Sequence, residues 1–293
     1  MSKKAMGKLL CGDAHQQLKR LPDSCADVGV TSPPYNKQEN KKGWLVKNVK
    51  YDIASDKLPE DEYQQQQINV LNELFRVIKP GGSFFYNHKV RWERGVMLHP
   101  IMWLAKTDWT VRQEIVWDRC IAANIRGWRF WQVDERIYWL HKPKNGDRIG
   151  VELQSRHAKL TSVWRFIPEG KNPHPAPFPL VLPLRAIYSV MNEDAGVVID
   201  PYCGSGTTLV AAKLLGHKYI GIDASRDYLH MSSDRLKNFE RERGVWMAEC
   251  ALHTVQESAA EKRKAGKYAG KFAPSATVQN KKSRQRDLLH QPE

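Results

Sequence analysis

The stretch VVIDPYCGSGTTLVAAKLLGHKYIGID, residues 197–223, decides the fold of this chain. The apolar run at 197–199 predicts a buried strand, the glycine-containing stretch after it predicts a tight turn, and residues 207–215 predict a helix. A second apolar run at 219–222 predicts the next strand, which ends at Asp223. This strand–turn–helix–strand order is typical of a βαβ unit in a parallel sheet.

The turn in this unit favours a nucleoside cofactor. Gly204 and Gly206 let a ligand approach the backbone, and the helix N-terminus after them favours a carboxylate or phosphate. Asp223 can accept hydrogen bonds from both ribose hydroxyls. A dinucleotide site is disfavoured because Leu209 stands where G-x-G-x-x-G needs glycine, and a P-loop is disfavoured because no Lys follows Gly206. S-adenosylmethionine fits better, with its amino acid end at the turn and its ribose at Asp223.

Helix and strand patterns alternate over much of the remaining chain. Strands are predicted at 8–11, 26–30, 83–87 and 109–117, and helices at 14–21, 58–78, 184–191 and 227–243. Residues 79–82, Lys-Pro-Gly-Gly, predict a helix stop and a turn. The alternation predicts an α/β fold with a doubly wound sheet.

A second motif, TSPPYN at 31–36, follows the predicted strand at 26–30. Two prolines directly after a strand fix a backbone carbonyl in space. The Tyr35 ring offers a stacking face for a base taken out of a duplex. We interpret this motif and the 197–223 stretch as two halves of one active site, the first for a planar amine and the second for the cofactor.

The charge of the chain indicates a polyanionic partner. The 293 residues carry a formal net charge of +14, which predicts nucleic-acid binding. Residues 256–293 contain nine Lys and Arg against four Asp and Glu, so about +9 remains on the preceding residues. The alternative, a basic tail on an ordinary protein, is therefore weaker. The tail has little apolar content and is expected to be disordered.

Several other classes are disfavoured by composition. The five cysteines are odd in number and none forms a CxxC pair, which argues against a disulfide framework or a metal site. The N-terminus lacks an apolar stretch of signal-peptide length, and no run of about 18 apolar residues predicts a membrane span. We therefore expect an intracellular, soluble protein.

Residues 119–168 interrupt the alternation and are rich in Arg, Lys and aromatic side chains. Interleaved basic and aromatic residues suit contacts with phosphates and bases. The candidate DNA contacts are Arg126, Arg129, Trp131 and Arg156. The alternative is an insertion with a small core of its own, since Trp is frequently a core residue.

In combination, DPYCGSGTT at 200–208 and SPPY at 32–35 resemble the amino-methyltransferases of DNA restriction-modification systems. The order matches their β arrangement, in which the catalytic motif precedes the cofactor motif and the target-recognition region lies between them. The resemblance covers about residues 8–240. It implies a Rossmann-like sheet, S-adenosylmethionine as cofactor and double-stranded DNA as substrate. A cognate restriction endonuclease and a second copy of the chain are the further partners that it suggests.

The resemblance also implies a set of cofactor contacts. Residues 174–179, HPAPFP, resemble a cofactor-contacting HPxxxP stretch, although Phe178 replaces a Lys that is frequent there. Asp13 resembles an acid that contacts the adenine amino group, but it is equally well placed as a helix N-cap before Ala14. The full set is Asp13, Phe178, Asp200, Cys203, Gly204, Gly206, Thr207 and Asp223.

For the chemistry, the resemblance points to Ser32, Pro33, Pro34 and Tyr35. The exocyclic amino nitrogen of a base is a poor nucleophile, so acceptors for its two hydrogens would promote direct methyl transfer. The Ser32 hydroxyl and the Pro33 carbonyl are the expected acceptors, Pro34 would keep the loop rigid, and Tyr35 would stack on the flipped base. No Pro-Cys dipeptide occurs, which argues against a covalent cytosine-C5 mechanism.

Ser before Pro-Pro-Tyr favours cytosine N4 as the acceptor, since relatives with Asp there mostly methylate adenine N6. Adenine N6 is the first alternative, and a catalytically inactive nucleic-acid-binding protein is the second. The expected organisation is a catalytic half at 1–118, a target-recognition insertion at 119–168, a cofactor-binding half at 169–255 and a basic tail at 256–293.

Overall fold

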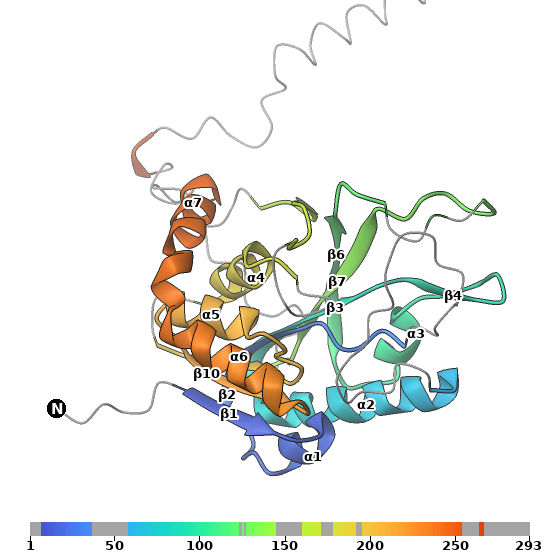
Figure 1. Cartoon of the computed structure of the whole chain (residues 1–293), viewed down its shortest axis with the longest axis horizontal. Coiled ribbons are helices and arrows are strands. Elements are labelled where there is room, and N and C mark those ends of the chain that lie inside the picture. Colours follow the sequence, from blue (N-terminus) through green and yellow to red (C-terminus); the bar gives the residue numbers. More distant parts are fainter. Residues whose placement is uncertain are drawn as a thin grey trace, which may run out of the picture. The chain divides into compact units, whose positions relative to one another are not determined.

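The computed structural model describes residues 7–36, 58–122, 125, 127–144, 160–170, 178–191, 195–253 and 264–266. The chain divides into two compact units, Met1–Thr254 and Val255–Glu293. The fold below is that of the first unit (Figure 1). Most of the predicted tail, and residues 37–57 after the TSPPYN motif, lie outside the described residues.

Eight strands of the described residues form the central sheet, in the order β1-β10-β9-β2-β3-β7-β6-β8. The first five strands in this order, from β1 through β10, β9 and β2 to β3, are parallel to one another. β7 runs antiparallel to both of its neighbours, and β8 is parallel to β6. A separate hairpin pairs β4 with β5. The strands are β1 (Gly7–Cys11), β2 (Ala26–Thr31), β3 (Ile78–His88), β4 (Arg91–Glu93), β5 (Val96–Leu98), β6 (Thr110–Asp118), β7 (Asp134–His141), β8 (Val163–Arg165), β9 (Val197–Asp200) and β10 (Lys218–Asp223).

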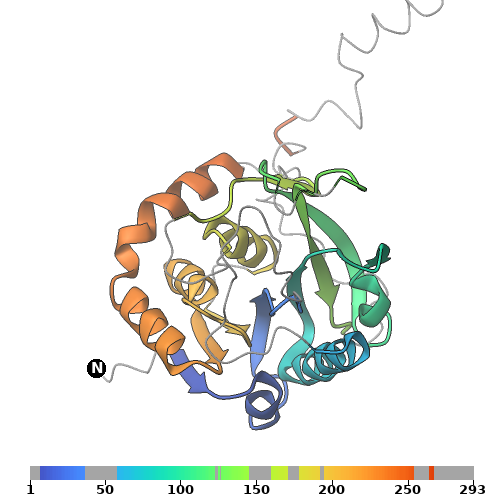
Figure 2. The same cartoon turned by 45° about the vertical axis from the view of Figure 1, so that its right-hand side comes forward.

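Helices cover both faces of this sheet. The helices are α1 (Ala14–Lys19), α2 (Glu60–Val77), α3 (Ile101–Leu104), α4 (Val181–Val190), α5 (Thr207–Leu214), α6 (Arg226–Lys237), the 3₁₀ helix η2 (Phe239–Glu242) and α7 (Arg243–His253). Figure 2 shows the yellow and orange helices α4–α7 on one side of the strands and the blue and cyan helices α1 and α2 on the other. The fold is thus the doubly wound α/β architecture that the sequence predicts. Among the described residues, no helix combines the length and the apolar character needed to cross a membrane.

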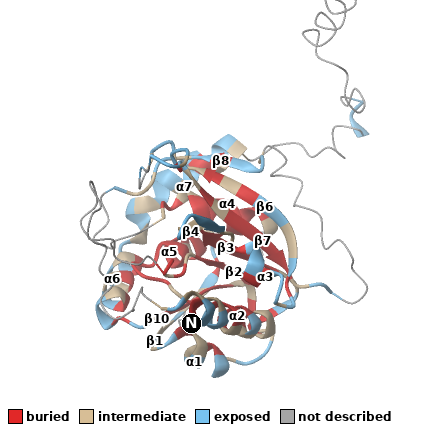
Figure 3. Cartoon of the chain, turned by 90° about the vertical axis from the view of Figure 1, so that its right-hand side faces the viewer, coloured by how far each residue is buried: buried red, intermediate tan, exposed pale blue. Residues whose placement is uncertain are grey.

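The core has one cluster on each side of the sheet. Phe85 packs with α4 and α5 in one cluster, whereas Phe84 and Tyr86 pack with α2 and Trp103 in the other. Successive side chains of a strand point to opposite faces, so β3 supplies both clusters. Figure 3 shows the resulting buried band through the central strands. Burying each large side chain contributes about 1.5–3 kcal/mol.

The predicted turn at 79–82 lies inside β3 rather than before it. Ala26 of β2 pairs with Ile78, while Val28 pairs with Ser83, so residues 79–82 bulge out against a single residue of β2. Gly81 has a φ of +85°, which glycine adopts without strain. The predicted turn at 79–82 is therefore present, but the pairing of β3 with β2 already begins before it, at Ile78.

The predicted insertion at 119–168 needs a correction, because residues 134–141 form β7 inside the central sheet. β7 lies between β3 and β6, and Ile137, Tyr138 and Leu140 are fully buried. Trp139 and Trp164, which were grouped with basic residues in the sequence, are also core residues. The segment is therefore not a separate insertion along its whole length. Target recognition by the parts that flank β7 stays a prediction.

Candidate active site

The two sequence motifs meet at the carboxyl edge of the sheet. β2 and β9 are parallel neighbours, with Val28 paired to Val198 and Gly29 to Ile199. From β2 the chain continues to β3 on one side, and from β9 it continues to β10 on the other. Such a reversal of strand order opens a crevice outside the carboxyl ends of the two strands, where α/β proteins bind ligands. TSPPYN follows β2 at this point, and the glycine turn follows β9.

A direct hydrogen bond joins the two motifs. Thr31 Oγ1 donates to Asp200 Oδ1 at 2.6 Å, and the Tyr202 backbone N–H donates to the same oxygen at 3.0 Å. Asp200 is 1% exposed. Burial raises the pKa of Asp200 to about 6, and the nearby Asp223 carboxylate acts in the same direction against these hydrogen bonds.

The second oxygen of this carboxylate is buried within the protein. Asp200 Oδ2 is buried and has no hydrogen-bond partner among the described residues. The Thr208 hydroxyl, which lies 3.4 Å from the Val30 carbonyl oxygen, also approaches the carboxylate, and its hydrogen bond lowers the pKa of Asp200 against the effect of burial. A buried, unpaired carboxylate oxygen is unfavourable unless a donor or a cation reaches it. A positive charge at the junction of the two motifs would therefore stabilise the Asp200 carboxylate.

The glycine turn has the backbone that its sequence predicts. Gly204 and Gly206 have φ angles of +48° and +81°, a region that favours glycine. A Cβ atom at Gly206 would lie 2.8 Å from Ser232 Oγ, and the same hydroxyl donates to the Gly204 carbonyl oxygen at 2.6 Å. Helix α6 thus packs closely behind the turn. Any larger residue at position 206 would push this helix away.

Two further cofactor candidates in this turn are buried and already bonded. The Cys203 backbone N–H donates to the Ile222 carbonyl oxygen at 2.9 Å, and burial raises the pKa of the Cys203 thiol, which stays neutral. Thr207 Oγ1 accepts a hydrogen bond from Arg235 Nη1 at 2.8 Å. These side chains therefore shape the turn, and their contact with the cofactor stays a prediction.

Asp223 lies where an acid at the end of β10 is expected. Its two carboxylate oxygens accept hydrogen bonds from the backbone N–H groups of Gly204 and Ser225, each at 2.9 Å. Its carbonyl oxygen accepts from Gly12 at 2.9 Å, which brings Asp13 to the same edge. The Asp13 carboxylate accepts from the Gln16 backbone N–H at 2.9 Å and caps α1. The N-cap interpretation of Asp13 is thus observed, and its cofactor contact stays a prediction.

Phe178 is partly buried and packs against the core cluster that contains Cys203. Residues 174–177 of the HPxxxP stretch lie outside the described residues. Phe178 lies three residues before α4, and its contact with the cofactor stays a prediction.

Hydrogen bonds fix the TSPPYN loop on both sides of its prolines. The Pro34 carbonyl oxygen accepts from the Tyr63 hydroxyl of α2 at 2.8 Å. The Asn36 side chain donates to the Leu58 carbonyl oxygen at 2.9 Å and accepts from the Leu58 backbone N–H at 2.8 Å. Asn36 has a φ of +51°, a conformation that Asn tolerates better than most residues. The loop is thus preorganised, as catalysis by positioning requires.

Tyr35 is held in a buried polar cluster. Its hydroxyl lies 2.5 Å from Ser32 Oγ and donates to Glu135 Oε2 at 2.9 Å. Asn87 Nδ2 donates to the Tyr35 hydroxyl at 2.8 Å and to Glu135 Oε2 at 3.0 Å. The Tyr35 side chain is 6% exposed, and its ring centroid lies 4.6 Å from that of His88. One ring face is therefore covered, and stacking on a base stays a prediction for the other.

Asn87 and Glu135 belong to the site but were not identified from the sequence. Asn87 is the last residue of the predicted strand at 83–87, and a polar residue at the carboxyl end of a parallel strand was a usable indication. Glu135 reaches the same edge because β7 is antiparallel and therefore begins there. Nothing in the local sequence reveals that orientation. Glu135 is therefore a site residue that can be identified only from the three-dimensional fold.

The predicted DNA contacts divide into two groups. Arg126 and Arg156 lie outside the described residues. Arg129 places its guanidinium carbon 4.1 Å from the ring centroid of Trp92, on β4, and Trp131 is 63% exposed. The neighbouring Phe130 is 98% exposed. Arg129, Phe130 and Trp131 lie in the connection between β6 and β7, at the same edge of the sheet as the TSPPYN loop.

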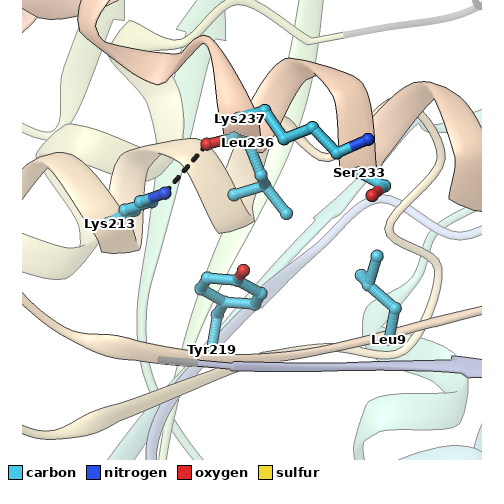
Figure 4. Close-up of a pocket in the computed structure, with 6 residues that line it drawn as sticks. All are labelled: Leu9, Lys213, Tyr219, Ser233, Leu236 and Lys237. Atoms are coloured by element: carbon cyan, nitrogen blue, oxygen red, sulfur yellow. Dashed lines mark hydrogen bonds between the residues drawn. The ribbon is translucent and has the colours of Figure 1, made fainter. Parts of the chain in front are cut away.

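A small cavity of about 160 Å³ lies elsewhere, between the sheet and α6 (Figure 4). Its lining residues are Leu9, Lys213, Tyr219, Ser233, Leu236 and Lys237. Lys213 Nζ donates to the Leu236 carbonyl oxygen at 2.9 Å. None of the candidate site residues lines this cavity, so it is separate from the carboxyl edge.

Comparisons with known proteins agree with this geometry. A family model for N6/N4 methyltransferases, described as DNA methylase, matches residues 26–234. The type II methyltransferase M.HpaI of Haemophilus parainfluenzae is 29% identical over 253 residues, covering 78% of this chain and 74% of that protein.

Solved structures share the fold. The protein TTHA0409 of Thermus thermophilus, solved in complex with S-adenosyl-L-methionine, has a TM-score of 0.58 and 24% identity, covering 80% of this chain and 95% of that chain. The cytosine-N4-specific PvuII DNA methyltransferase has a TM-score of 0.62 and 17% identity, covering 86% of this chain and 96% of that chain. Taken with the family match over most of the sheet and both motifs, the chain belongs to the N6/N4 DNA methylase family, a family of DNA amino-methyltransferases.

Proposed function

We propose that this chain transfers a methyl group from S-adenosylmethionine to the exocyclic N4 of cytosine in duplex DNA. The observation that carries the proposal is the 2.6 Å hydrogen bond from Thr31 Oγ1 to Asp200 Oδ1. It joins the loop that would hold the target amine to the turn that would hold the methyl donor. Ser32 directly follows Thr31, so the acceptor for the amine lies next to this junction.

The residues at the glycine turn suit S-adenosylmethionine. This cofactor carries a sulfonium and an α-ammonium group, and the unpaired Asp200 Oδ2 provides a buried partner for positive charge. Asp223 would accept hydrogen bonds from the ribose diol with lone pairs other than those that Gly204 and Ser225 engage. The backbone around Gly206 and the start of α5 would face the amino acid end. When bound, the cofactor supplies an electrophilic methyl group.

The TSPPYN loop supplies acceptors for the amino group of the base. The Pro34 carbonyl is occupied by Tyr63, which leaves the Pro33 carbonyl and the Ser32 hydroxyl as the expected acceptors for the two amino hydrogens. Two acceptors placed in this way favour a pyramidal nitrogen whose lone pair points away from the ring. The role of the loop is therefore orientation and polarisation of the amine.

The choice of cytosine over adenine rests on Ser32. The cytosine-N4 specificity of the PvuII enzyme belongs to a relative of the same fold, and adenine N6 is the alternative product. The test is to incubate purified protein and S-adenosylmethionine with unmethylated plasmid DNA and to analyse the nucleosides by mass spectrometry. N4-methylcytosine is expected. N6-methyladenine as sole product would overturn the cytosine assignment and leave the family unchanged.

The second alternative is a protein that binds DNA without methylating it. Calorimetry with S-adenosylmethionine, combined with transfer of a tritiated methyl group to DNA, separates the two cases. Cofactor binding with no transfer to unmethylated genomic DNA would favour the inactive protein. The restriction endonuclease and the second copy of the chain stay predictions from the resemblance.

DNA contact is proposed at an aromatic face formed by the β4–β5 hairpin and residues 127–133. Trp92 and Trp128 meet edge to face with centroids 6.3 Å apart, and Gln132 Nε2 donates to the Val90 carbonyl oxygen at 3.1 Å. Phe130, at 98% exposure, projects from a surface that these contacts hold in place. Such a ring beside Arg129 suits insertion between bases while the arginine contacts phosphate.

Phe130→Ala tests this face. We expect DNA affinity to fall by about tenfold, since one aromatic–base stack contributes about 1–3 kcal/mol. The matched control is Leu252→Ala, which removes an exposed apolar side chain from α7. Equal affinities of the two variants would move the DNA contact away from residues 127–133.

A further inference from the structure

Glu135 collects hydrogen-bond donors from several strand ends. Its Oε2 accepts from the Tyr35 hydroxyl at 2.9 Å and from Asn87 Nδ2 at 3.0 Å. Its Oε1 lies 3.2 Å from Arg119 Nη1 and 3.9 Å from Lys89 Nζ. The side chain is 7% exposed. A buried carboxylate of this kind requires such donors, and residues at the ends of three strands, β2, β3 and β6, provide them.

The partners of Tyr35 determine the direction of each hydrogen bond. A carboxylate only accepts, so the single hydroxyl proton of Tyr35 points to Glu135 Oε2. The Tyr35 oxygen must then be an acceptor in its 2.5 Å contact with Ser32 Oγ. Ser32 is therefore the donor in that contact. Asn87 confirms the pattern, because its Nδ2 donates to Tyr35 and to Glu135, and the flipped amide would set Oδ1 against the carboxylate.

We infer that Glu135 is a positioning residue for methyl transfer, acting on Ser32 through Tyr35. The Ser32 proton is directed to Tyr35, and Asn87 Nδ2 donates to Ser32 Oγ at 3.3 Å, so the remaining lone pair of this oxygen is the acceptor offered to the amine. The target amine presents two hydrogens and needs acceptors, so a Ser32 hydroxyl that donated to the amine nitrogen would occupy the attacking lone pair. Glu135 excludes that orientation. The inference rests on the proposed function, since it assumes that Ser32 meets the amine.

A second cluster of the same composition provides a matched control. Glu249 of α7 is 5% exposed, accepts from the Tyr188 hydroxyl at 2.9 Å and pairs with Arg185 Nε at 2.7 Å. Arg185 and Tyr188 lie on α4, and His253 of α7 places its Nε2 3.6 Å from Glu249 Oε1, so none of the three partners belongs to the TSPPYN loop. Glu249→Gln and Tyr188→Phe therefore disturb a buried Glu–Tyr–Arg cluster without touching the catalytic edge.

The first experiment compares Tyr35→Phe and Glu135→Gln with these controls. Tyr35→Phe keeps the ring and removes only the link, so it tests the inference even if Glu135→Gln fails to fold. With unmethylated genomic DNA, we expect kcat to fall on the order of 10²-fold in both variants, with the Kd for S-adenosylmethionine unchanged. The control variants should keep wild-type kcat when folded. Wild-type kcat in folded Tyr35→Phe would overturn the inference.

The second experiment measures binding alone. The methylated site and base are first taken from the product of the wild-type protein. Two duplexes are then made, one with the target base and one with hydrogen in place of its amino group. Wild-type protein should prefer the amino duplex by about tenfold, the contribution of one hydrogen bond. In Tyr35→Phe and Glu135→Gln this preference should disappear, while it persists in Tyr188→Phe.

The outcomes separate the two levels of the proposal. A preference retained in both catalytic-edge variants would show that Ser32 does not depend on Glu135, and the inference would be wrong with the proposed function intact. A wild-type protein that methylates no amino group in any DNA would instead remove the proposed function. Equal loss of kcat in Glu249→Gln would assign both glutamates a structural role.

Discussion

The catalytic edge and the α4–α7 contact both bury a paired glutamate, but they differ in the other acceptors that lie beside it. At the α4–α7 contact, Glu249 Oε1 accepts from Arg185 and Tyr188, and Oε2 accepts from Arg185 Nη2 at 3.0 Å. At the catalytic edge, Glu135 is also paired, yet Asn87 Oδ1 and Asp200 Oδ2 are buried there without hydrogen-bond partners among the described residues.

This difference separates stability from binding. A fully paired buried acid holds two elements together, because removing either partner leaves an uncompensated charge. A buried acceptor that stays unpaired lowers stability, and a ligand that donates a hydrogen bond to it removes this cost. The α4–α7 contact therefore belongs to the first kind of site. The catalytic edge is of the second kind, supported from behind by Glu135.

The largest expected effect is on stability at the α4–α7 contact. Glu249→Ala leaves Arg185 buried without its carboxylate, which should lower the free energy of unfolding by about 3–5 kcal/mol. Urea unfolding measures this, and methyl transfer per folded molecule should match the wild type at low temperature. A stability loss below about 1 kcal/mol would mean that this buried pair is not the stabilising element described here.

At the catalytic edge the corresponding loss should be in rate. Ser32→Ala removes one acceptor for the amine, which is expected to lower kcat by about 10²–10³-fold with little change in stability. The control is Ser189→Ala on α4, whose hydroxyl donates to the Ala186 carbonyl oxygen. Single-turnover methyl transfer with both variants provides the measurement. Wild-type rates in Ser32→Ala would remove the TSPPYN loop from the chemistry.

Asp223 distinguishes binding from rate within the catalytic edge. Asp223→Ala deletes an acceptor for the ribose diol and should weaken S-adenosylmethionine binding by about 1.5–3 kcal/mol. Calorimetry detects this, with Asp234→Ala on the exposed side of α6 as the control. An unchanged dissociation constant in the folded variant would place the ribose elsewhere.

The smallest expected effect is a dependence on pH. Burial raises the pKa of Asp200 to about 6 from an ordinary 3.8, so the folded protein holds this proton more tightly than the unfolded chain. The Asp200 share of stability is therefore lost as pH rises between these values. A cationic cofactor binds better to the ionised Asp200 carboxylate than to its protonated form. Below about pH 6, cofactor binding therefore requires that Asp200 release its proton.

Cofactor affinity should consequently be about tenfold weaker at pH 5 than at pH 7, a difference of about 1.4 kcal/mol. Asp200→Asn should abolish the dependence in this range. If the wild-type affinity is constant from pH 5 to pH 7, then Asp200 does not face the positive charge of the cofactor.

The region around the glycine turn could be predicted closely because its determinants are local. The helix expected at 207–215 is α5 (Thr207–Leu214), and the strand expected at 219–222 is β10 (Lys218–Asp223). Apolar runs bounded by glycine are sufficient for such a unit. The meeting of the two motifs also followed, since carboxyl ends of parallel strands share one edge.

Pairing between distant segments could not be predicted in the same way. β7 is buried on both faces and antiparallel, so its residues show neither alternation nor the βα rhythm. Residues of the same type therefore differ in burial, since Trp139 lies in the core and Trp131 is exposed. Glu135 lies in the site only because β7 pairs antiparallel with β3 and begins at the catalytic edge. The buried supporting residues of the active site were thus the part that the sequence concealed.

The two hydrogen bonds between Asn36 and Leu58 have a consequence for changes in the length of this chain. They hold the two ends of the stretch at 37–57 side by side, at Asn36 and Leu58. Because the entropy of closing a loop rises only logarithmically, doubling the intervening length adds only about 0.6 kcal/mol. A change of length that preserves these two bonds would therefore leave Asn36, two residues after Pro34, where it stands.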